Sequence, residues 1–183
     1  MEDVLRNPAK AGGETWEQAA FETIFSDHYA RVVAVLQRLV GDRAEAEEAA
    51  MDVFSKLFEQ PLNSERDHNF GGWLYRAATR LGLDRLRAAR RRRQCEEAAG
   101  LDLAACSHAP SPLDSVLRAE TCRQVREALS RLKPARAELL VLRSSGLSYK
   151  ELAEALGVKA SSIGTLLARA EAEFEKEYRA SSR

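Results

Sequence analysis

The stretch YKELAEALGVKASSIGTL, residues 149–166, decides more about the fold than any other part of the sequence. Ser148 precedes it and suits the first position of a short helix, because its hydroxyl can accept hydrogen bonds from free backbone N–H groups. Gly157 lies in the middle of this stretch, and glycine can end a helix in the left-handed conformation without a clash at Cβ. The apolar positions around this turn are predicted to share one core: Leu152, Ala153, Leu156, Val158, Ile163 and Leu166. The spacing predicts a helix-turn-helix, whose second helix enters the major groove of DNA.

The outward side of this predicted unit carries few positive charges. An ordinary helical hairpin would show similar apolar spacing, so that alternative stays open. Serine and threonine can touch bases or phosphates, but strong bidentate readers are scarce here. Binding to the DNA backbone then depends on scattered cations. The candidate DNA contacts of this unit are Arg136, Arg143, Lys150, Lys159, Ser161, Ser162, Thr165 and Arg169.

Charge is unevenly distributed along the chain. Its 183 residues include 28 basic and 28 acidic ones, and 45% are hydrophobic, which is enough for a folded core. Residues 73–94 nevertheless hold eight arginines and one acid, whereas residues 42–59 hold six acids and two bases. Because salt screens charges beyond about 10 Å, a partner responds to the local patch. A basic and an acidic surface, and two different partners, are therefore predicted.

The periodicity of apolar residues predicts an all-α fold of two small helical domains joined by a flexible linker. Helices are expected at about 16–40, 43–58, from 70 or 73 into the arginine run, and at 114–131. The predicted inner face of the helix at 43–58 consists of Ala46, Ala49, Ala50, Val53, Phe54 and Leu57. A break at Lys133-Pro134 should precede three shorter helices that end near residue 178. The expected division is an N-terminal extension (1–20), a first domain (21–93), a linker (94–115), a helix-turn-helix domain (116–178) and a tail (179–183).

The arginine-rich helix is a second candidate DNA-binding element. Four arginines, Arg76, Arg80, Arg87 and Arg91, recur at near-helical spacing opposite the apolar face, which suits contact with a phosphate backbone. A solvated arginine face is the alternative. The polar loop before this helix is better placed to bind single-stranded bases than Phe70 and Trp73, which are expected in the core. Its candidate residues are Asn63, Arg66, His68 and Asn69.

The sequence offers little for catalysis, and no enzyme activity and no cofactor are predicted. It lacks a glycine-rich phosphate loop, a nucleophile elbow and metalloprotease spacing. Zinc binding by Cys95, Cys106, His108 and Cys122 is disfavoured because tight paired spacing is missing, so no metal site is expected. An odd cysteine count without a signal peptide or a bilayer-length apolar run predicts reduced thiols, a cytoplasmic protein and no membrane partner.

The ordered motifs resemble bacterial sigma factors of the extracytoplasmic-function group. They are Phe25-Ser-Asp-His-Tyr, Gly41-Asp-Arg-Ala-Glu-Ala-Glu-Glu-Ala-Ala-Met-Asp-Val-Phe, Phe70-Gly-Gly-Trp-Leu-Tyr-Arg-Ala-Ala, Leu83-Asp-Arg-Leu-Arg, Leu132-Lys-Pro, Gly146-Leu-Ser-Tyr-Lys-Glu-Leu-Ala and Leu156-Gly-Val. The resemblance runs from about Phe21 to Tyr178. No single motif is decisive, but the ordered set is specific.

The resemblance implies a division of labour that agrees with the charge map. The partners it implies are core RNA polymerase (the β′ clamp and the β flap) and promoter DNA, with an anti-sigma factor as a further candidate. The loop and third helix would recognise and help open the minus-ten element, and the helix-turn-helix would read the minus-thirty-five element. The second helix would dock on polymerase through Asp42, Glu45, Glu48, Asp52 and Phe54.

Three features qualify these expectations. Glu48-Ala-Ala-Met51-Asp52 departs from the family's usual Asp-Leu-Val-Gln-Glu, and Arg80 stands where an asparagine is common on the third helix. Gly164-Thr165-Leu166 replaces the usual polar cluster of the recognition helix. Promoter specificity therefore does not transfer. A helix-turn-helix repressor or activator that never touches polymerase is the competing class, and it would not need the acidic second helix.

Overall fold

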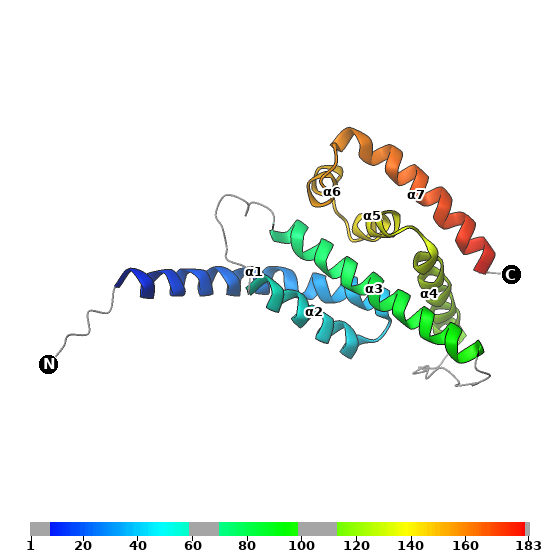
Figure 1. Cartoon of the computed structure of the whole chain (residues 1–183), viewed down its shortest axis with the longest axis horizontal. Helices are drawn as coiled ribbons and strands as arrows, with labels where there is room; N and C mark the ends of the chain where they lie inside the picture. The colour runs from blue at the N-terminus through cyan, green and yellow to red at the C-terminus, as the bar shows by residue number, and fades with distance from the viewer. Residues whose placement is uncertain (1–7, 59–69, 99–112, 182–183) are drawn as a thin grey trace.

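A computed structural model of the chain describes residues 8–58, 70–98 and 113–181, and the side chains within them except those of 8–20, 97 and 113–117. This described part consists of helices without strands, as the sequence predicts. The helices are α1 (Pro8–Val40), α2 (Arg43–Phe58), α3 (Phe70–Ala98), α4 (Leu113–Arg131), α5 (Pro134–Ser144), α6 (Tyr149–Leu156) and α7 (Ala160–Ser181) (Figure 1).

Helices α1 to α3 form the first domain. Gly41 has a φ of +89° and ends α1, and Asp42 then caps α2, its Oδ1 accepting a hydrogen bond from the backbone N of Glu45 at 2.8 Å. The inner face of α2 is the one that the sequence predicts, and all six of its members are buried: Ala46, Ala49, Ala50, Val53, Phe54 and Leu57. Three alanines let α2 lie close to its neighbours, while the Phe54 ring fills the space beside Phe25, with ring centroids 4.7 Å apart.

Helices α4 to α7 form the second domain, and α6, α7 and the turn between them confirm the predicted helix-turn-helix geometry. The Ser148 side chain accepts a hydrogen bond from the backbone N of Glu151, whose carboxylate accepts one from the backbone N of Ser148. Gly157 ends α6 with a φ of +67°. The expectation that Val158 joins the core is wrong, because its side chain is 38% exposed at the turn, whereas Ile163 is fully buried.

The helix ends differ from the predicted ones where charged residues continue a helix. Helix α3 runs to Ala98 and α4 begins at Leu113, so both ends of the segment predicted as a linker, 94–115, are helical; residues 99–112 lie outside the described ranges. Arginine and glutamate are good helix formers, and a helix therefore persists after its apolar periodicity has ended. Helix α1 begins at Pro8, earlier than the predicted start at about residue 16, and α7 includes part of the expected tail.

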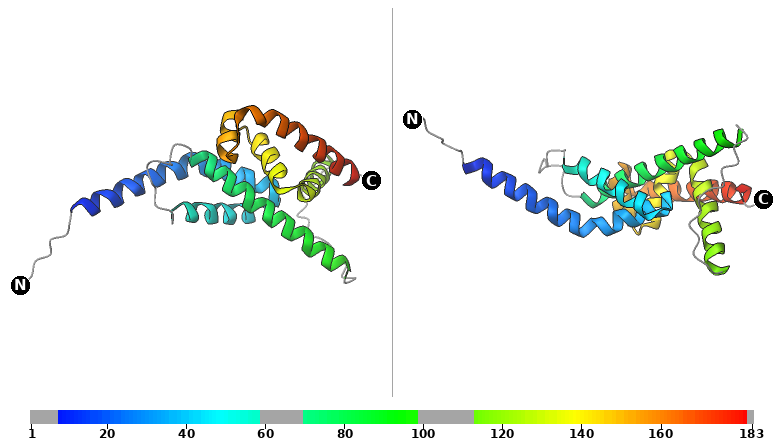
Figure 2. Two further views of the ribbon diagram at one scale, coloured as in Figure 1. Left: turned by 45° about the horizontal axis from the view of Figure 1, so that its top comes forward. Right: turned by 90° about the horizontal axis from the view of Figure 1, so that it is seen from below.

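The two domains pack against each other. Helices α5 and α6 lie along α3, and α4 lies beside the C-terminal half of α3, while the N-terminal part of α1 projects away from the body (Figures 1 and 2). Leu83 and Leu86 of α3 are buried with Leu129 and Leu132, which lie at the end of α4 and just beyond it. The two predicted helical domains are therefore in direct contact in this structure. None of the helices in the described ranges is long and apolar enough to cross a lipid bilayer.

Candidate functional site

One face of α2 presents apolar and acidic side chains to solvent. Glu48, Met51, Ser55 and Phe58 follow one another at spacings of three and four residues, which places them on one side of the helix. All four are exposed, Met51 at 50% and Phe58 at 68%. Large apolar side chains exposed together in this way mark an interaction surface more often than isolated ones do. We call these four residues the α2 face.

The five residues predicted to bind polymerase have different surroundings. The prediction that Phe54 contacts polymerase is wrong for this conformation, because its side chain lies in the core and is only 1% exposed. Asp42 is exposed and caps α2. Glu45 and Asp52 lie near one arginine of α3: Nη2 of Arg85 is 2.9 Å from Oδ2 of Asp52, and its Nη1 is 3.7 Å from Oε1 of Glu45. Glu48 is exposed on the α2 face.

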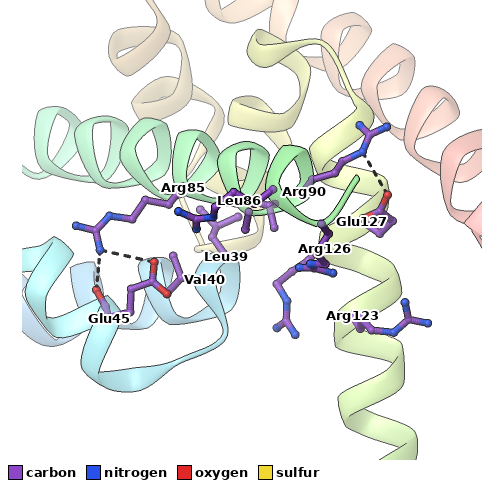
Figure 3. A pocket seen from close by; sticks show the side chains of 12 residues that line it. Leu39, Val40, Glu45, Arg85, Leu86, Arg90, Arg123, Arg126 and Glu127 are labelled. Carbon is purple, nitrogen blue, oxygen red and sulfur yellow. Dashed lines mark hydrogen bonds and ion pairs between the residues drawn. The ribbon is translucent and has the colours of Figure 1, made fainter. Parts of the chain in front are cut away.

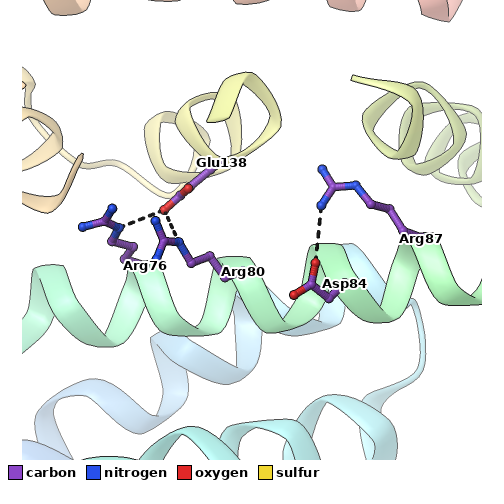
Figure 4. A network of polar contacts seen from close by, with 5 residues as sticks. All are labelled: Arg76, Arg80, Asp84, Arg87 and Glu138. Atoms are coloured by element: carbon purple, nitrogen blue, oxygen red, sulfur yellow. Dashed lines mark hydrogen bonds and ion pairs between the residues drawn. The ribbon is translucent and has the colours of Figure 1, made fainter. Parts of the chain in front are cut away.

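Two arginines of α3, Arg76 and Arg80, are held toward the second domain (Figure 4). The Nε atoms of Arg76 and Arg80 each donate a hydrogen bond of 3.1 Å to Oε1 of Glu138, which projects from α5. The side chain of Glu138 is only 7% exposed. Arg87 pairs with Asp84 of its own helix at 3.5 Å, and Arg91 is exposed. Of the four arginines of the predicted stripe, two are therefore engaged by a carboxylate of the other domain.

Further along α3, a basic pocket of about 120 Å³ lies against α4 (Figure 3). Two ion pairs cross it: Arg85 with Glu45 of α2, and Arg90 with Glu127 of α4, whose Nε and Oε1 are 3.4 Å apart. Cations outnumber anions in its lining, which includes Arg85, Arg90, Arg92, Arg93, Arg123, Arg126, Glu45 and Glu127. This part of α3 and α4 presents a locally positive surface to any anionic partner.

The helix-turn-helix leaves the outward side of α7 open. The candidate DNA contacts there, and the lysine just before α7, are all exposed: Lys159, Ser161, Ser162, Thr165 and Arg169. Lys150 is 85% exposed on α6. Arg143 donates to the carbonyl oxygen of Leu147 at 3.0 Å and its guanidinium lies 5.4 Å from the centre of the Tyr149 ring, so it is held beside the turn. Arg136 instead forms an ion pair with Glu173 of α7.

The hydrogen bonds of the α6 cap also perturb an ionisable group. The Ser148 hydroxyl and backbone N–H interact with the Glu151 carboxylate and hold its pKa below the ordinary value. The charged form of Glu151 therefore stabilises the start of α6, and with it the orientation of the helix-turn-helix.

Several predicted residues cannot be placed. Asn63, Arg66, His68 and Asn69 of the polar loop lie outside the described residues, as do Cys106 and His108. Cys95 and Cys122 are exposed free thiols. Within the part of the chain that the structure describes, no group of three or more histidine, cysteine, aspartate or glutamate side chains is arranged to hold a metal ion.

Sequence reasoning missed three residues that the structure makes prominent. Met51 and Phe58 lie opposite the buried face of α2, and their spacing of seven residues was a signal that they share a face. Glu138 is the only acid within α5, between apolar residues, which signals a buried partner without identifying it.

Comparison with known protein families and relatives finds matches over both domains. The profile described as Sigma-70 region 2 matches residues 24–92, and the one described as Sigma-70, region 4 matches residues 122–174. The probable ECF RNA polymerase sigma factor SigI of Mycobacterium tuberculosis is 34% identical over 147 residues, which are 78% of this chain and 50% of that protein.

Two further relatives extend this comparison. The ECF RNA polymerase sigma factor SigE of Mycolicibacterium smegmatis is 30% identical over 161 residues, covering 87% of this chain and 60% of the relative. The ECF RNA polymerase sigma factor SigW of Bacillus subtilis is 25% identical over 170 residues, covering 89% and 91%. The chain thus spans about half the length of the mycobacterial SigI and nearly the whole of SigW.

Proposed function

Because the chain belongs to the extracytoplasmic-function group of the sigma-70 family, we propose that it binds core RNA polymerase and directs promoter-specific initiation of transcription. The observation that carries this proposal is that region 2 and region 4 match one chain in order, over residues 24–92 and 122–174. It is a binding protein that performs no chemistry of its own, and it acts in the cytoplasm, beside polymerase and DNA.

The proposed polymerase contact is the α2 face together with the neighbouring acids. Met51 and Phe58 supply apolar area, and Glu48 supplies a negative charge beside it. Interfaces derive most of their binding energy from a few such apolar anchors, surrounded by polar groups that fix the orientation. The β′ clamp is the proposed partner of this face, and the β flap is the proposed partner of the second domain. Phe54 belongs to the inner side of α2, where its ring packs against Phe25 and so holds in place the helix that carries this face.

The proposed promoter contacts are divided between the two domains. Helix α3 contacts the minus-ten element through Arg76, Arg80, Arg87 and Arg91, with the preceding loop at the bases. Helix α7 contacts the minus-thirty-five element with the exposed residues at its N-terminal end, while Arg143 and Lys150 reach the DNA backbone from α5 and α6. The two sites act together, because each raises the effective concentration of the other once polymerase holds both domains.

A binding assay with purified core polymerase tests the proposed docking face. We expect Phe58→Ala to weaken the complex about tenfold or more, as the loss of an apolar anchor does. Glu48→Lys should weaken it severalfold, and its matched control is Glu171→Lys, which reverses an exposed acid on α7. If the wild-type chain does not bind core polymerase, the sigma-factor proposal is wrong and the helix-turn-helix repressor or activator takes its place. If the wild-type chain binds core polymerase and Phe58→Ala and Glu48→Lys bind equally well, the docking face lies elsewhere.

A candidate regulator follows from the same surfaces. The α2 face and the exposed side of α7 are both open in this structure, and an anti-sigma factor would inhibit the chain by covering either of them. Competition between such a protein and core polymerase for the chain is the measurement that identifies it.

A further inference from the structure

The buried carboxylate of Glu138 lies between the two domains. It projects from α5, is 7% exposed, and accepts hydrogen bonds at 3.1 Å from the Nε atoms of both Arg76 and Arg80 on α3 (Figure 4). A carboxylate with so little access to water requires charged partners to offset the loss of its hydration. The two arginines supply this compensation, and the contact therefore holds α5 against α3.

Other contacts close the same interface. Arg31 and Arg38 of α1 donate to the carbonyl oxygens of Ser145 and Ser144, at 2.7 and 3.3 Å, where α5 ends. Cations are favourable at this end of a helix because of its dipole. The ion pair between Arg90 of α3 and Glu127 of α4 adds a further link, and a cluster of apolar residues from both domains lies beneath these contacts. The closed arrangement is thus specified at several independent points.

From this geometry we infer that Glu138 stands in for a DNA phosphate and keeps the minus-ten face of α3 occupied until the two domains separate. Guanidinium groups bind carboxylates and phosphates with the same donor geometry. The Nε donors of Arg76 and Arg80 that contact Glu138 are consequently engaged and not available to a phosphate in the closed chain. The inference deepens the proposed function and rests on it, since it requires these two arginines to contact promoter DNA.

The consequence is a chain that binds DNA weakly by itself. The affinity of a binding site is reduced in proportion to the fraction of molecules in which that site is open. A partner that binds the separated domains better than the packed ones shifts the chain toward the open form. Core polymerase is such a partner if it holds the two domains apart on the β′ clamp and the β flap. Its binding would then free Arg76 and Arg80 for promoter DNA.

Substitution of Glu138 tests this contact in the free chain. Glu138→Gln keeps the shape of the side chain and removes its charge. We expect its affinity for a fluorescein-labelled 30-base-pair duplex, measured by anisotropy without polymerase, to rise at least threefold, and its radius of gyration in X-ray scattering to increase. The matched control is Glu171→Gln, which removes an exposed charge of α7 and should change neither quantity. An unchanged affinity and radius in Glu138→Gln would overturn the inference.

Two additional measurements separate the inference from the proposed function. In the free chain that carries Glu138→Gln, the further substitutions Arg76→Gln/Arg80→Gln should abolish the gain in affinity for DNA. In the complex with core polymerase, the same pair should weaken promoter binding at least tenfold. Normal promoter binding by that complex would refute the proposed role of the arginines. If the pair weakens the polymerase complex but the free chain shows no gain with Glu138→Gln, the occupied-face inference alone is wrong.

A measurement that does not need the Glu138 variant remains decisive if that variant fails to fold. The ¹⁵N spectrum of the arginine side chains should show two protected Nε–H signals that Arg76→Gln and Arg80→Gln each remove singly. Both signals should change when core polymerase binds. Two rapidly exchanging signals in the free chain would contradict the closed contact.

Discussion

Helices α3 and α7 are the two elements proposed to face promoter DNA, and they differ in charge and in exposure. Helix α3 contains the stretch of eight arginines at 73–94, but two of its candidate contacts, Arg76 and Arg80, bind a carboxylate of the other domain. Helix α7 has its outward side open, yet that side carries mainly serine, threonine, glycine and alanine. The stronger electrostatic site is thus engaged, and the accessible site is weak.

If the proposed function is correct, this difference makes DNA binding by the chain depend on a partner. Affinity for DNA comes mainly from cations that neutralise phosphates, which favours α3. Discrimination between sequences comes from base-edge contacts in the major groove, which favours the recognition helix α7. A chain in which the arginines of α3 are engaged and only α7 is exposed would bind DNA weakly until polymerase makes both helices available.

The largest effect is expected from a cavity in the core that supports α7. Leu152 is fully buried and packs with Ile163 in the helix-turn-helix. Leu152→Ala should reduce the free energy of unfolding by about 2–5 kcal/mol, the usual cost of removing a buried leucine side chain. Urea denaturation followed by circular dichroism measures this loss. A destabilisation below about 1 kcal/mol would mean that the two helices are not supported by this core.

The second prediction compares cations of α3 with hydroxyls of α7 in the complex with core polymerase. Arg76→Ala/Arg80→Ala should lower the magnitude of the slope of log affinity against log salt by about 1.4–1.8, because two phosphate contacts are lost. Ser161→Ala/Ser162→Ala should reduce affinity less and leave the slope unchanged. Equal slopes for both pairs would remove the proposed difference between the helices.

A smaller gain is expected when a cation is added to α7. Thr165 is exposed on the outward side, so Thr165→Arg should raise affinity for DNA severalfold and increase the salt slope by about 0.9. Ala172→Arg adds the same charge to an exposed position further along α7 and serves as the control. The assignment of the outward side is contradicted if both variants bind DNA equally well.

The smallest effect concerns the cap that orients α6. Ser148→Ala should cost about 1 kcal/mol of stability at pH 7. The pKa of Glu151 is lowered in the folded chain, so its charged form stabilises the fold above the ordinary carboxylate pKa of about 4.3, and this contribution is lost as the pH falls through the lowered pKa. The difference in stability between the wild type and Glu151→Gln should therefore shrink below about pH 4. A difference that stays constant down to pH 2 would disprove the linkage.

Local sequence signals predicted most of the secondary structure and part of the site. The bounds of α2, its six buried residues, the Ser148 cap and the turn at Gly157 follow from periodicity and from residue types that act within one helical turn. Helix ends within charged segments were predicted less well. Arginine and glutamate beyond residue 93 continue α3 without any apolar pattern, because their own helix propensity is sufficient.

Contacts between the domains could not be predicted, because they depend on packing between residues far apart in the chain. The sequence shows that Arg76 and Arg80 share a helix face, but nothing near them indicates that Glu138, about 60 positions later, will meet them. Phe54 is a case in which a contact was predicted but is absent. The family resemblance implied a polymerase contact for it, whereas its position on the apolar side of α2 buries its side chain. Periodicity was the more reliable guide there.

Transcription in vitro tests the central claim most directly. Core RNA polymerase is combined with the wild-type chain or with Arg76→Ala/Arg80→Ala on a library of promoter fragments, and the transcripts are sequenced. We predict transcripts from a defined subset of fragments that share two separated sequence elements, only when the wild-type chain is present, and their loss with the arginine variant. Initiation that does not depend on the chain, or a chain that binds DNA tightly while polymerase stays inactive, would contradict the account.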